Sequence, residues 1–205
     1  GNGPSLSTAD LEVMSVLPAF GLNRISLIYD STSWRPTYFV MVSTNFTDPE
    51  WFEDALESCR VAERTFAHPD FATAASAADE SLASKVTALH LTEGEQVRFE
   101  APDDWWSQDP NVRVSKFGTS LLVAAQIAVY MGFKPLVLTG IDMNFRDTLW
   151  TRNRVFRRAG KMPFLRSLAR DPNHFSPNYG TPGFDAVTLN MNMAAAFRLM
   201  ARASA

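Results

Sequence analysis

The sequence is poor in cysteine, with Cys59 the one residue of this type among 205. A single thiol excludes an internal disulfide and a zinc site built on several cysteines, and it is typical of a protein from a reducing compartment. Histidine is also scarce, at three residues, and the sequence has no cluster of histidine and aspartate that would suggest a metal site. We therefore expect a cytoplasmic protein that needs no bound metal.

Positive charge is not in excess, since the formal net charge is -3 and the isoelectric point is near 5.6. Broad nucleic-acid binding needs a basic surface that displaces counterions, so we expect no nucleic-acid partner. No run of residues reaches the roughly 18 apolar positions of a membrane-spanning helix. With 46% hydrophobic residues, the chain fits one domain with a substantial core.

Short apolar runs alternate with helical patterns, which predicts parallel strands joined by helical crossovers. The expected strands are Leu22 to Leu27, Tyr38 to Ser43, Arg60 to Phe66, Val86 to Leu91 and Pro135 to Thr139. The expected helices are Glu50 to Arg60, begun by Asp48 and Pro49, Ala72 to Ser84, the stretch from Thr119 or Ser120 to Gly132, and Phe184 to Arg202. The sequence thus predicts an α/β, Rossmann-like domain with a mostly parallel sheet flanked by helices.

Two segments carry polar groups where an open parallel sheet presents them to a ligand. The opening loop GNGPSL, Gly1 to Leu6, has the composition of a tight loop whose amides can face an anion. The segment GTSLLVAAQIAVYMGFKPLVLTGIDMNF begins at a polar helix N-terminus and ends after a strand-like run with Asp142. Local capping is the alternative role for Thr119, Ser120 and Asp142.

These two segments, together with Asn23 on the second strand, resemble the bacterial lipooligosaccharide sialyltransferases of glycosyltransferase family 42. They are also similar to a wider set of domains that includes archaeal 6-hydroxymethylpterin pyrophosphokinase-like proteins. The resemblance runs from Gly1 to about Tyr179 and is dense in the opening loop and in 118–145. In that family the opening motif follows the first parallel strand, so we expect a strand before Gly1.

The resemblance implies a site for a cytidine monophosphate (CMP) sugar donor. The nucleotide-binding residues implied are Gly1, Asn2, Gly3, Asn23, Ser43, Thr119, Ser120, Gly140, Asp142 and Asn144. We expect the Asn2 amide to donate to a phosphate or a ribose hydroxyl, with Gly1 and Gly3 leaving room for the nucleotide. The alternatives are a plain turn for the opening loop and an Asx turn for Asn23.

The second half of the chain supplies the candidate base and cations. His174, in DPNHFSPNYG, matches the family histidine that removes the proton from the acceptor hydroxyl, a task that suits an imidazole near neutral pH. A structural histidine is the alternative. The run from Arg152 to Arg170 is rich in arginine, and Arg152 and Arg154 are expected to contact the donor phosphate unless the run is a solvated helix face.

The chain also departs from the family. Two tyrosines that assist departure of the nucleotide phosphate correspond here to Asn144 and Trp150, and an arginine before the Thr-Ser pair corresponds to Phe117. Neither Asn144 nor Trp150 carries a phenol. The donor sugar therefore stays open between sialic acid and another acidic sugar.

The resemblance implies a metal-independent glycosyltransferase that moves a sugar from a CMP donor to a carbohydrate or glycolipid acceptor. Residues 1–145 would form the nucleotide-binding core, 146–180 a lid and catalytic loop, and 181–205 a C-terminal helix on the core. A homo-oligomer and a peripheral contact with the cytoplasmic face of the inner membrane are compatible with this function. The alternatives are an ATP-dependent pyrophosphokinase-like transferase, which would need Mg²⁺ held by acids such as Asp142, and a catalytically inert nucleotide-binding or assembly domain.

Overall fold

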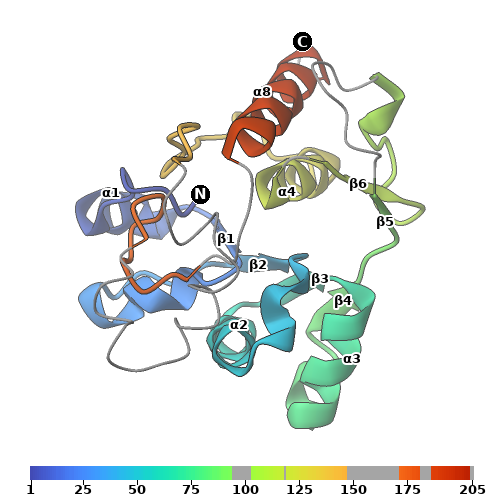
Figure 1. The fold of residues 1–205 in the computed structure, drawn as a ribbon. Helices are drawn as coiled ribbons and strands as arrows, with labels where there is room; N and C mark the ends of the chain where they lie inside the picture. Colours follow the sequence, from blue (N-terminus) through green and yellow to red (C-terminus); the bar gives the residue numbers. More distant parts are fainter. Residues whose placement is uncertain (94–102, 118, 147–170, 181–185, 204–205) are drawn as a thin grey trace, which may run out of the picture.

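The structure, a computed structural model, describes residues 1–93, 103–117, 119–146, 171–180 and 186–203. Its centre is a parallel sheet in the order β1-β2-β3-β4, so strands that follow one another in the chain are also neighbours in the sheet (Figure 1). These strands are β1 (Phe20–Leu22), β2 (Tyr38–Met41), β3 (Arg64–Ala67) and β4 (Val86–Ala88). A separate parallel pair joins β5 (Leu91–Glu93) to β6 (Val114–Lys116).

Helices cover both faces of the four-stranded sheet. The α-helices are α1 (Thr8–Val13), α2 (Pro49–Val61), α3 (Pro69–Ala78), α4 (Ser120–Tyr130) and α8 (Ala186–Ala203). Short 3₁₀ turns are η1 (Met14–Val16), η2 (Ile25–Ser31), η3 (Thr44–Thr47), η4 (Glu80–Leu82) and η5 (Asp103–Trp105). Figure 1 shows α2 and α3 on one side of the sheet and α4 and α8 on the other. The predicted α/β class, with a parallel sheet flanked by helices, is confirmed.

Apolar side chains of β2 point alternately to the two faces of the sheet, so helices must pack on both faces. Phe39 and Met41 belong to the core cluster on the side of α2 and α3, while Val40 belongs to the cluster on the side of α4. All three are fully buried, as expected for a central parallel strand with helices on both faces. A third cluster joins α4 to α8, so the C-terminal helix packs on α4, outside the sheet.

Local signals set the helix starts as expected. The Asp48 carboxylate accepts the Glu50 amide at 3.0 Å and Pro49 opens α2, which then runs on to Val61. The Thr119 hydroxyl accepts the Leu121 amide at 3.2 Å at the start of α4. The mainly apolar helix α4 then runs for 11 residues to Tyr130, and the chain turns at Gly132, whose φ is +87°.

Three expected strands and one expected helix have a bound that is wrong by three residues or more. The first strand ends at Leu22 instead of Leu27, because Asn23 adopts a φ of +50° and the chain continues as η2. The strand expected from Arg60 begins at Arg64, because α2 does not end before Val61. The expected strand from Val86 to Leu91 is divided between β4 and β5, which belong to different sheets. Helix α3 begins at Pro69, capped by His68, and ends at Ala78, since Asp79 caps the next turn.

The strand predicted at Pro135 to Thr139 is wrong. Residues 135–139 form no strand and pair with no strand of the described chain, and Leu136, Val137 and Leu138 are 37, 70 and 43% exposed. An apolar run becomes a strand only where a neighbouring backbone supplies hydrogen-bond partners, and here only the last carbonyls meet the opening loop.

The expected lid lies mostly on residues 147–170, outside the described residues, while its last part, 171–180, is described and packs beside the opening loop. The strand expected before Gly1 stays a prediction. None of the described helices is long and apolar enough to cross a membrane.

Candidate functional site

A pocket of about 470 Å³ lies at the carboxyl ends of β1 and β2, beside the first turn of α4. Every predicted site residue in the described part of the chain lines it: Gly1, Asn2, Gly3, Asn23, Ser43, Thr119, Ser120, Gly140, Asp142, Asn144 and His174. Arg152 and Arg154 lie outside the described residues. The carboxyl edge of a parallel sheet is where open α/β folds bind ligands, and predicted site residues from six chain segments meet here.

The glycines of the opening loop serve a close contact between two backbones. The Gly3 amide donates to the Gly140 carbonyl at 2.8 Å, and the Gly1 nitrogen donates to the Thr139 carbonyl at 2.6 Å. A Cβ on Gly3 would lie 2.0 Å from an Asp142 oxygen, and one on Gly140, whose φ is +64°, would lie 2.4 Å from the Gly1 carbonyl oxygen. The expectation that these amides face a nucleotide is corrected: they already bond residues 139–140.

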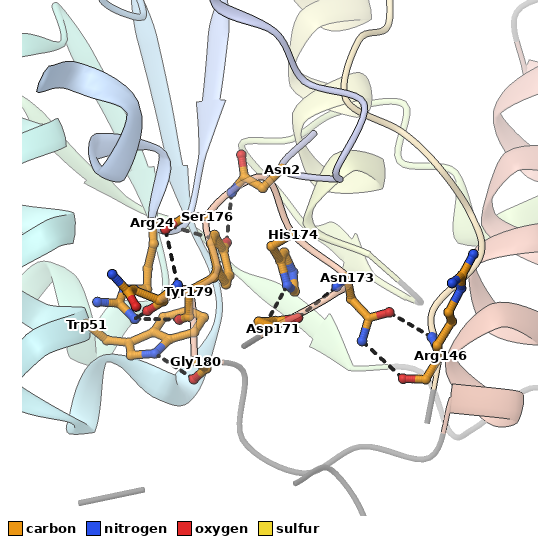
Figure 2. Close-up of polar contacts among 11 residues, drawn as sticks. Asn2, Arg24, Trp51, Arg146, Asp171, Asn173, His174, Ser176, Tyr179 and Gly180 are labelled. Atoms are coloured by element: carbon orange, nitrogen blue, oxygen red, sulfur yellow. Dashed lines mark hydrogen bonds and ion pairs between the residues drawn. The ribbon is translucent and has the colours of Figure 1, made fainter. Parts of the chain in front are cut away.

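Asn2 anchors the opening loop to two other segments (Figure 2). Its side-chain amide donates to the Leu22 carbonyl and to the Tyr179 hydroxyl, both at 2.7 Å, and its main-chain carbonyl accepts the Phe175 amide at 2.9 Å. Both amide hydrogens of the side chain are thus engaged, so the expected donation to a phosphate is wrong for this arrangement. The Oδ1 atom is buried, has no hydrogen-bond partner among the described residues, and can only accept.

Asp142, Ser43 and Thr119 act as caps. The Asp142 carboxylate accepts the Ser5 amide at 3.1 Å and the Ser5 hydroxyl at 3.0 Å, which holds the turn of the opening loop. Ser43 accepts the Asn45 amide at 3.2 Å, while Thr119 caps α4 as described above. A hydroxyl that accepts one hydrogen bond can still donate one, so capping leaves Ser43 and Thr119 a hydrogen for a ligand, and their nucleotide-binding role stays a prediction.

Asn23 and Ser120 form a long polar contact in the pocket, and the Asn23 side chain also hydrogen-bonds Tyr179. The Asn23 amide and the Ser120 hydroxyl are 3.4 Å apart, near the outer limit of hydrogen bonding. The Asn23 main chain is fixed, since its amide donates to the Val40 carbonyl at 3.1 Å. These two side chains can therefore exchange their mutual contact for a ligand at little cost.

His174 is held on three sides (Figure 2). Its Nδ1 atom lies 2.9 Å from the Asp171 carboxylate, and its ring stacks on Tyr179 with centroids 3.8 Å apart and planes 1° from parallel. The centroid of the Phe145 ring lies 5.4 Å from that of His174, with the two ring planes at 72°. Such a ring is oriented before any ligand arrives, which a general base requires.

Tyr179 stacks against the His174 ring, and no signal in the sequence marks this tyrosine as a site residue. Burial raises the pKa of its phenol to about 12, against a smaller opposite effect of the hydrogen bond from Asn2. The phenol is therefore neutral at physiological pH. Because its oxygen accepts a hydrogen bond from Asn2, Tyr179 links the opening loop to residues 171–180, which we call the histidine loop.

Arg24 is a second residue that sequence reasoning missed, because a lone arginine after a strand has no distinguishing pattern. It is 5% exposed and forms an ion pair with Asp54 at 2.5 Å. Its guanidinium donates to the main-chain carbonyls of Asn178 and Tyr179 and lies 5.4 Å from the Trp51 ring centroid. Trp51 itself donates to the Gly180 carbonyl at 3.3 Å. These contacts fix the end of the histidine loop.

Two asparagine side chains hold the segment after Asp142. Asn173 accepts the Arg146 amide at 2.7 Å and donates to its carbonyl at 3.1 Å, and Asn190 of α8 does the same for Phe145 at 2.9 and 2.8 Å. A carboxamide that pairs with both main-chain groups of one residue reproduces the pairing of a strand. Phe145 and Arg146 are thus fixed between residues 171–180 and α8.

Carboxamides dominate the polar lining of the pocket. Those described are Asn2, Asn23, Asn45, Asn144, Asn173 and Asn192, against one lysine, Lys116, and one carboxylate, Asp142. Carboxamides both donate and accept, which suits the uncharged polar edges of a sugar or a nucleobase. Among the described residues, no group of three or more His, Cys, Asp or Glu side chains could hold a metal ion.

Comparisons with protein-family models, with curated proteins and with solved structures return no match to this chain. The roles assigned to the pocket residues therefore stay predictions that derive from their chemistry and from the resemblance described above.

Proposed function

We propose that the protein is a glycosyltransferase with a Rossmann-like core, which moves an acidic sugar from a CMP donor to a hydroxyl of a carbohydrate or glycolipid. The observation that carries the proposal is the gathering of all described candidate residues around one pocket. Residues 1 and 174 lie at opposite ends of the sequence, so no local pattern brings them together. A ligand site at the carboxyl edge of the sheet accounts for this gathering.

The nucleotide would lie across Asn23, Ser120 and the first turn of α4. The weakly paired Asn23 and Ser120 offer donors and acceptors to a ribose or a pyrimidine edge. The N-terminus of α4 carries partial positive charge, and Lys116 lies just before it in the pocket lining, so both favour a phosphate there. The opening loop supports the pocket wall instead of donating to the phosphate.

The proposed chemistry is a direct displacement. His174 removes the proton from the acceptor hydroxyl as that oxygen forms a bond to the anomeric carbon of the sugar. The bond from this carbon to the phosphate oxygen breaks, and CMP departs with the electron pair. Lys116 and the α4 N-terminus stabilise the charge that develops on the phosphate, and Arg152 and Arg154 are proposed to add to it.

Calorimetric titration with CMP and with ATP, each with and without Mg²⁺, tests the donor. The proposal predicts CMP binding that is independent of Mg²⁺. Binding of ATP alone, dependent on Mg²⁺, would support the pyrophosphokinase alternative, and binding of neither would contradict both enzymes and leave an assembly domain.

His174→Gln tests the base. We expect the rate of sugar transfer from a CMP donor to fall by about two to four orders of magnitude, with the donor KM nearly unchanged. His90→Gln, at an exposed position away from the pocket lining, is the matched control and should retain the wild-type rate. An unchanged rate in His174→Gln would exclude the histidine as base.

A further inference from the structure

We propose that Asp171 is a positioning residue that fixes the tautomer of His174, with the proton on Nδ1 and the lone pair on Nε2. The catalytic part of this inference rests on the proposed function, because a general base must present a lone pair to its substrate. The tautomer assignment depends only on the contacts of His174, so it holds for any reaction that takes place in the pocket.

The carboxylate decides which ring nitrogen carries the proton. Asp171 Oδ2 and His174 Nδ1 are 2.9 Å apart, and the two side chains are only 9 and 10% exposed. An ionised carboxylate can only accept, so the neutral ring must donate from Nδ1. Nε2 is then left as the acceptor of the ring.

The carboxylate is itself held in place. Its other oxygen, Oδ1, accepts the Asn173 amide at 2.9 Å, and Asn173 in turn clamps the main chain of Arg146. Each carboxylate oxygen of Asp171 therefore has an assigned donor, one on the main chain and one on the ring. The Asp171 side chain cannot rotate without breaking one of these bonds.

The ring plane is fixed independently of the carboxylate. Tyr179 covers one face at 3.8 Å, and Phe145 meets the ring with its edge. Tyr179 cannot move freely, since Asn2 and the Arg24 amide both donate to its hydroxyl. Stacking sets the plane of the His174 ring, and Asp171 selects the orientation of its nitrogens within that plane.

A second histidine provides an opposite case in the same molecule. His68 Nδ1 accepts the Asp70 amide at 3.2 Å where it caps α3. A nitrogen that accepts carries no proton, so neutral His68 has its proton on Nε2. When both rings are neutral, His174 and His68 are thus expected to be opposite tautomers.

Long-range ¹H–¹⁵N spectra of the full chain labelled with ¹⁵N-histidine test this assignment at alkaline pH, where imidazole rings are neutral. With only three histidines, His174→Gln and His68→Gln assign the signals. We expect the Nδ1–H tautomer at His174 and the Nε2–H tautomer at His68. An Nε2–H tautomer at His174 in the wild-type protein would overturn the proposal.

Asp171→Asn sharpens the test, because the amide oxygen can keep the Asn173 amide while its NH₂ group replaces Oδ2. The NH₂ group donates to Nδ1 and drives His174 to the Nε2–H tautomer, while His68 is unchanged. We expect the transfer rate to fall by about two to four orders of magnitude, with the donor KM and the melting temperature close to those of the wild type. A tautomer that is the same in both proteins would overturn the proposal.

The tautomer measurement and the rate measurement together separate the role of Asp171 from the proposed function. If the tautomers reverse but the wild-type protein transfers no sugar from a CMP donor, the proposed function fails and the assignment of Asp171 stands. If the wild-type protein is active and the reversed tautomer leaves its rate unchanged, the positioning role of Asp171 is overturned while the transferase remains.

Discussion

The half of the molecule built from the sheet with α2 and α3 is held together differently from the half that forms the pocket. In the first, large apolar side chains such as Phe39, Leu56 and Phe71 are at most 2% exposed and pack in one cluster. In the second, polar side chains such as Asn2 and Arg24 bond to main-chain carbonyls of distant segments. Apolar packing is non-directional, whereas each of these hydrogen bonds depends on one named partner.

This difference implies that stability and ligand binding can be changed separately. Variants of the apolar half should lower the free energy of unfolding while leaving the pocket of the folded molecules intact. Variants of the polar half should cost less stability but loosen the segments that face the ligand.

Phe71→Ala should have the largest effect on stability. Its ring is fully buried against Phe46 and Phe52, and its removal should lower the free energy of unfolding by about 3–5 kcal/mol. Urea unfolding measures this loss, and Val61→Ala, at the exposed end of α2, should change it by less than about 0.5 kcal/mol. If the folded fraction of Phe71→Ala bound CMP much more weakly than the wild type, the separation of the two halves would be wrong.

Arg24→Met should lower the free energy of unfolding by about 2–4 kcal/mol, because it leaves the Asp54 carboxylate without its partner. The same change removes the donors to Asn178 and Tyr179, so CMP affinity should also fall. In a double-mutant cycle, Arg24→Met with Asp54→Asn should cost clearly less than the two single changes summed. Additive costs would show that the ion pair contributes nothing.

The raised pKa of Tyr179 predicts a specific alkaline loss of stability. The folded protein keeps this phenol proton up to about pH 12, while an unfolded tyrosine releases it near pH 10. The Tyr179 phenol therefore contributes its full stabilisation below pH 10. As the pH rises from 10 to 12, the free energy of unfolding falls by about 2–3 kcal/mol. Tyr179→Phe should lack this part of the decline in urea unfolding measured across that range. Parallel profiles for the two proteins would contradict the buried hydroxyl.

Asn173→Ala should have the smallest effect on stability, about 1–2 kcal/mol, since it removes the two bonds to Arg146 at the edge of the pocket. Because that segment also lines the pocket, we expect CMP affinity to fall more than stability does. Asn111→Ala, an exposed asparagine away from the pocket, is the matched control and should bind CMP like the wild type. Equal CMP affinity in both variants would exclude a role for the Arg146 clamp.

The elements that could be predicted from the sequence are those with local signals. Asp48 and Pro49 begin a helix wherever they precede an amphipathic stretch, and Thr119 and Gly132 delimit α4 for the same reason. Several candidate ligand residues could also be located, because the carboxyl ends of parallel strands meet at one edge.

The remaining features depend on partners far away in the chain. Residues 135–139 have the composition of a buried strand, yet composition does not state whether a neighbouring strand is present. Asn2 looked like a donor to a ligand, but Leu22 and Tyr179, 20 and 177 residues away, take both of its hydrogens. The Asp171–His174 contact spans three residues and could have been predicted from the sequence, since a carboxylate at that spacing in a turn can orient a histidine.

Hydrogen exchange with and without CMP tests the central claim most directly, because it reads both halves of the molecule in one experiment. We expect CMP to slow exchange in the opening loop, at 119–121, in 140–146 and in 171–180, with no change in β3, in α3 or in α2 beyond its first turn, which carries Trp51. Protection confined to α2 and α3, or no protection at saturating CMP, would contradict the claim.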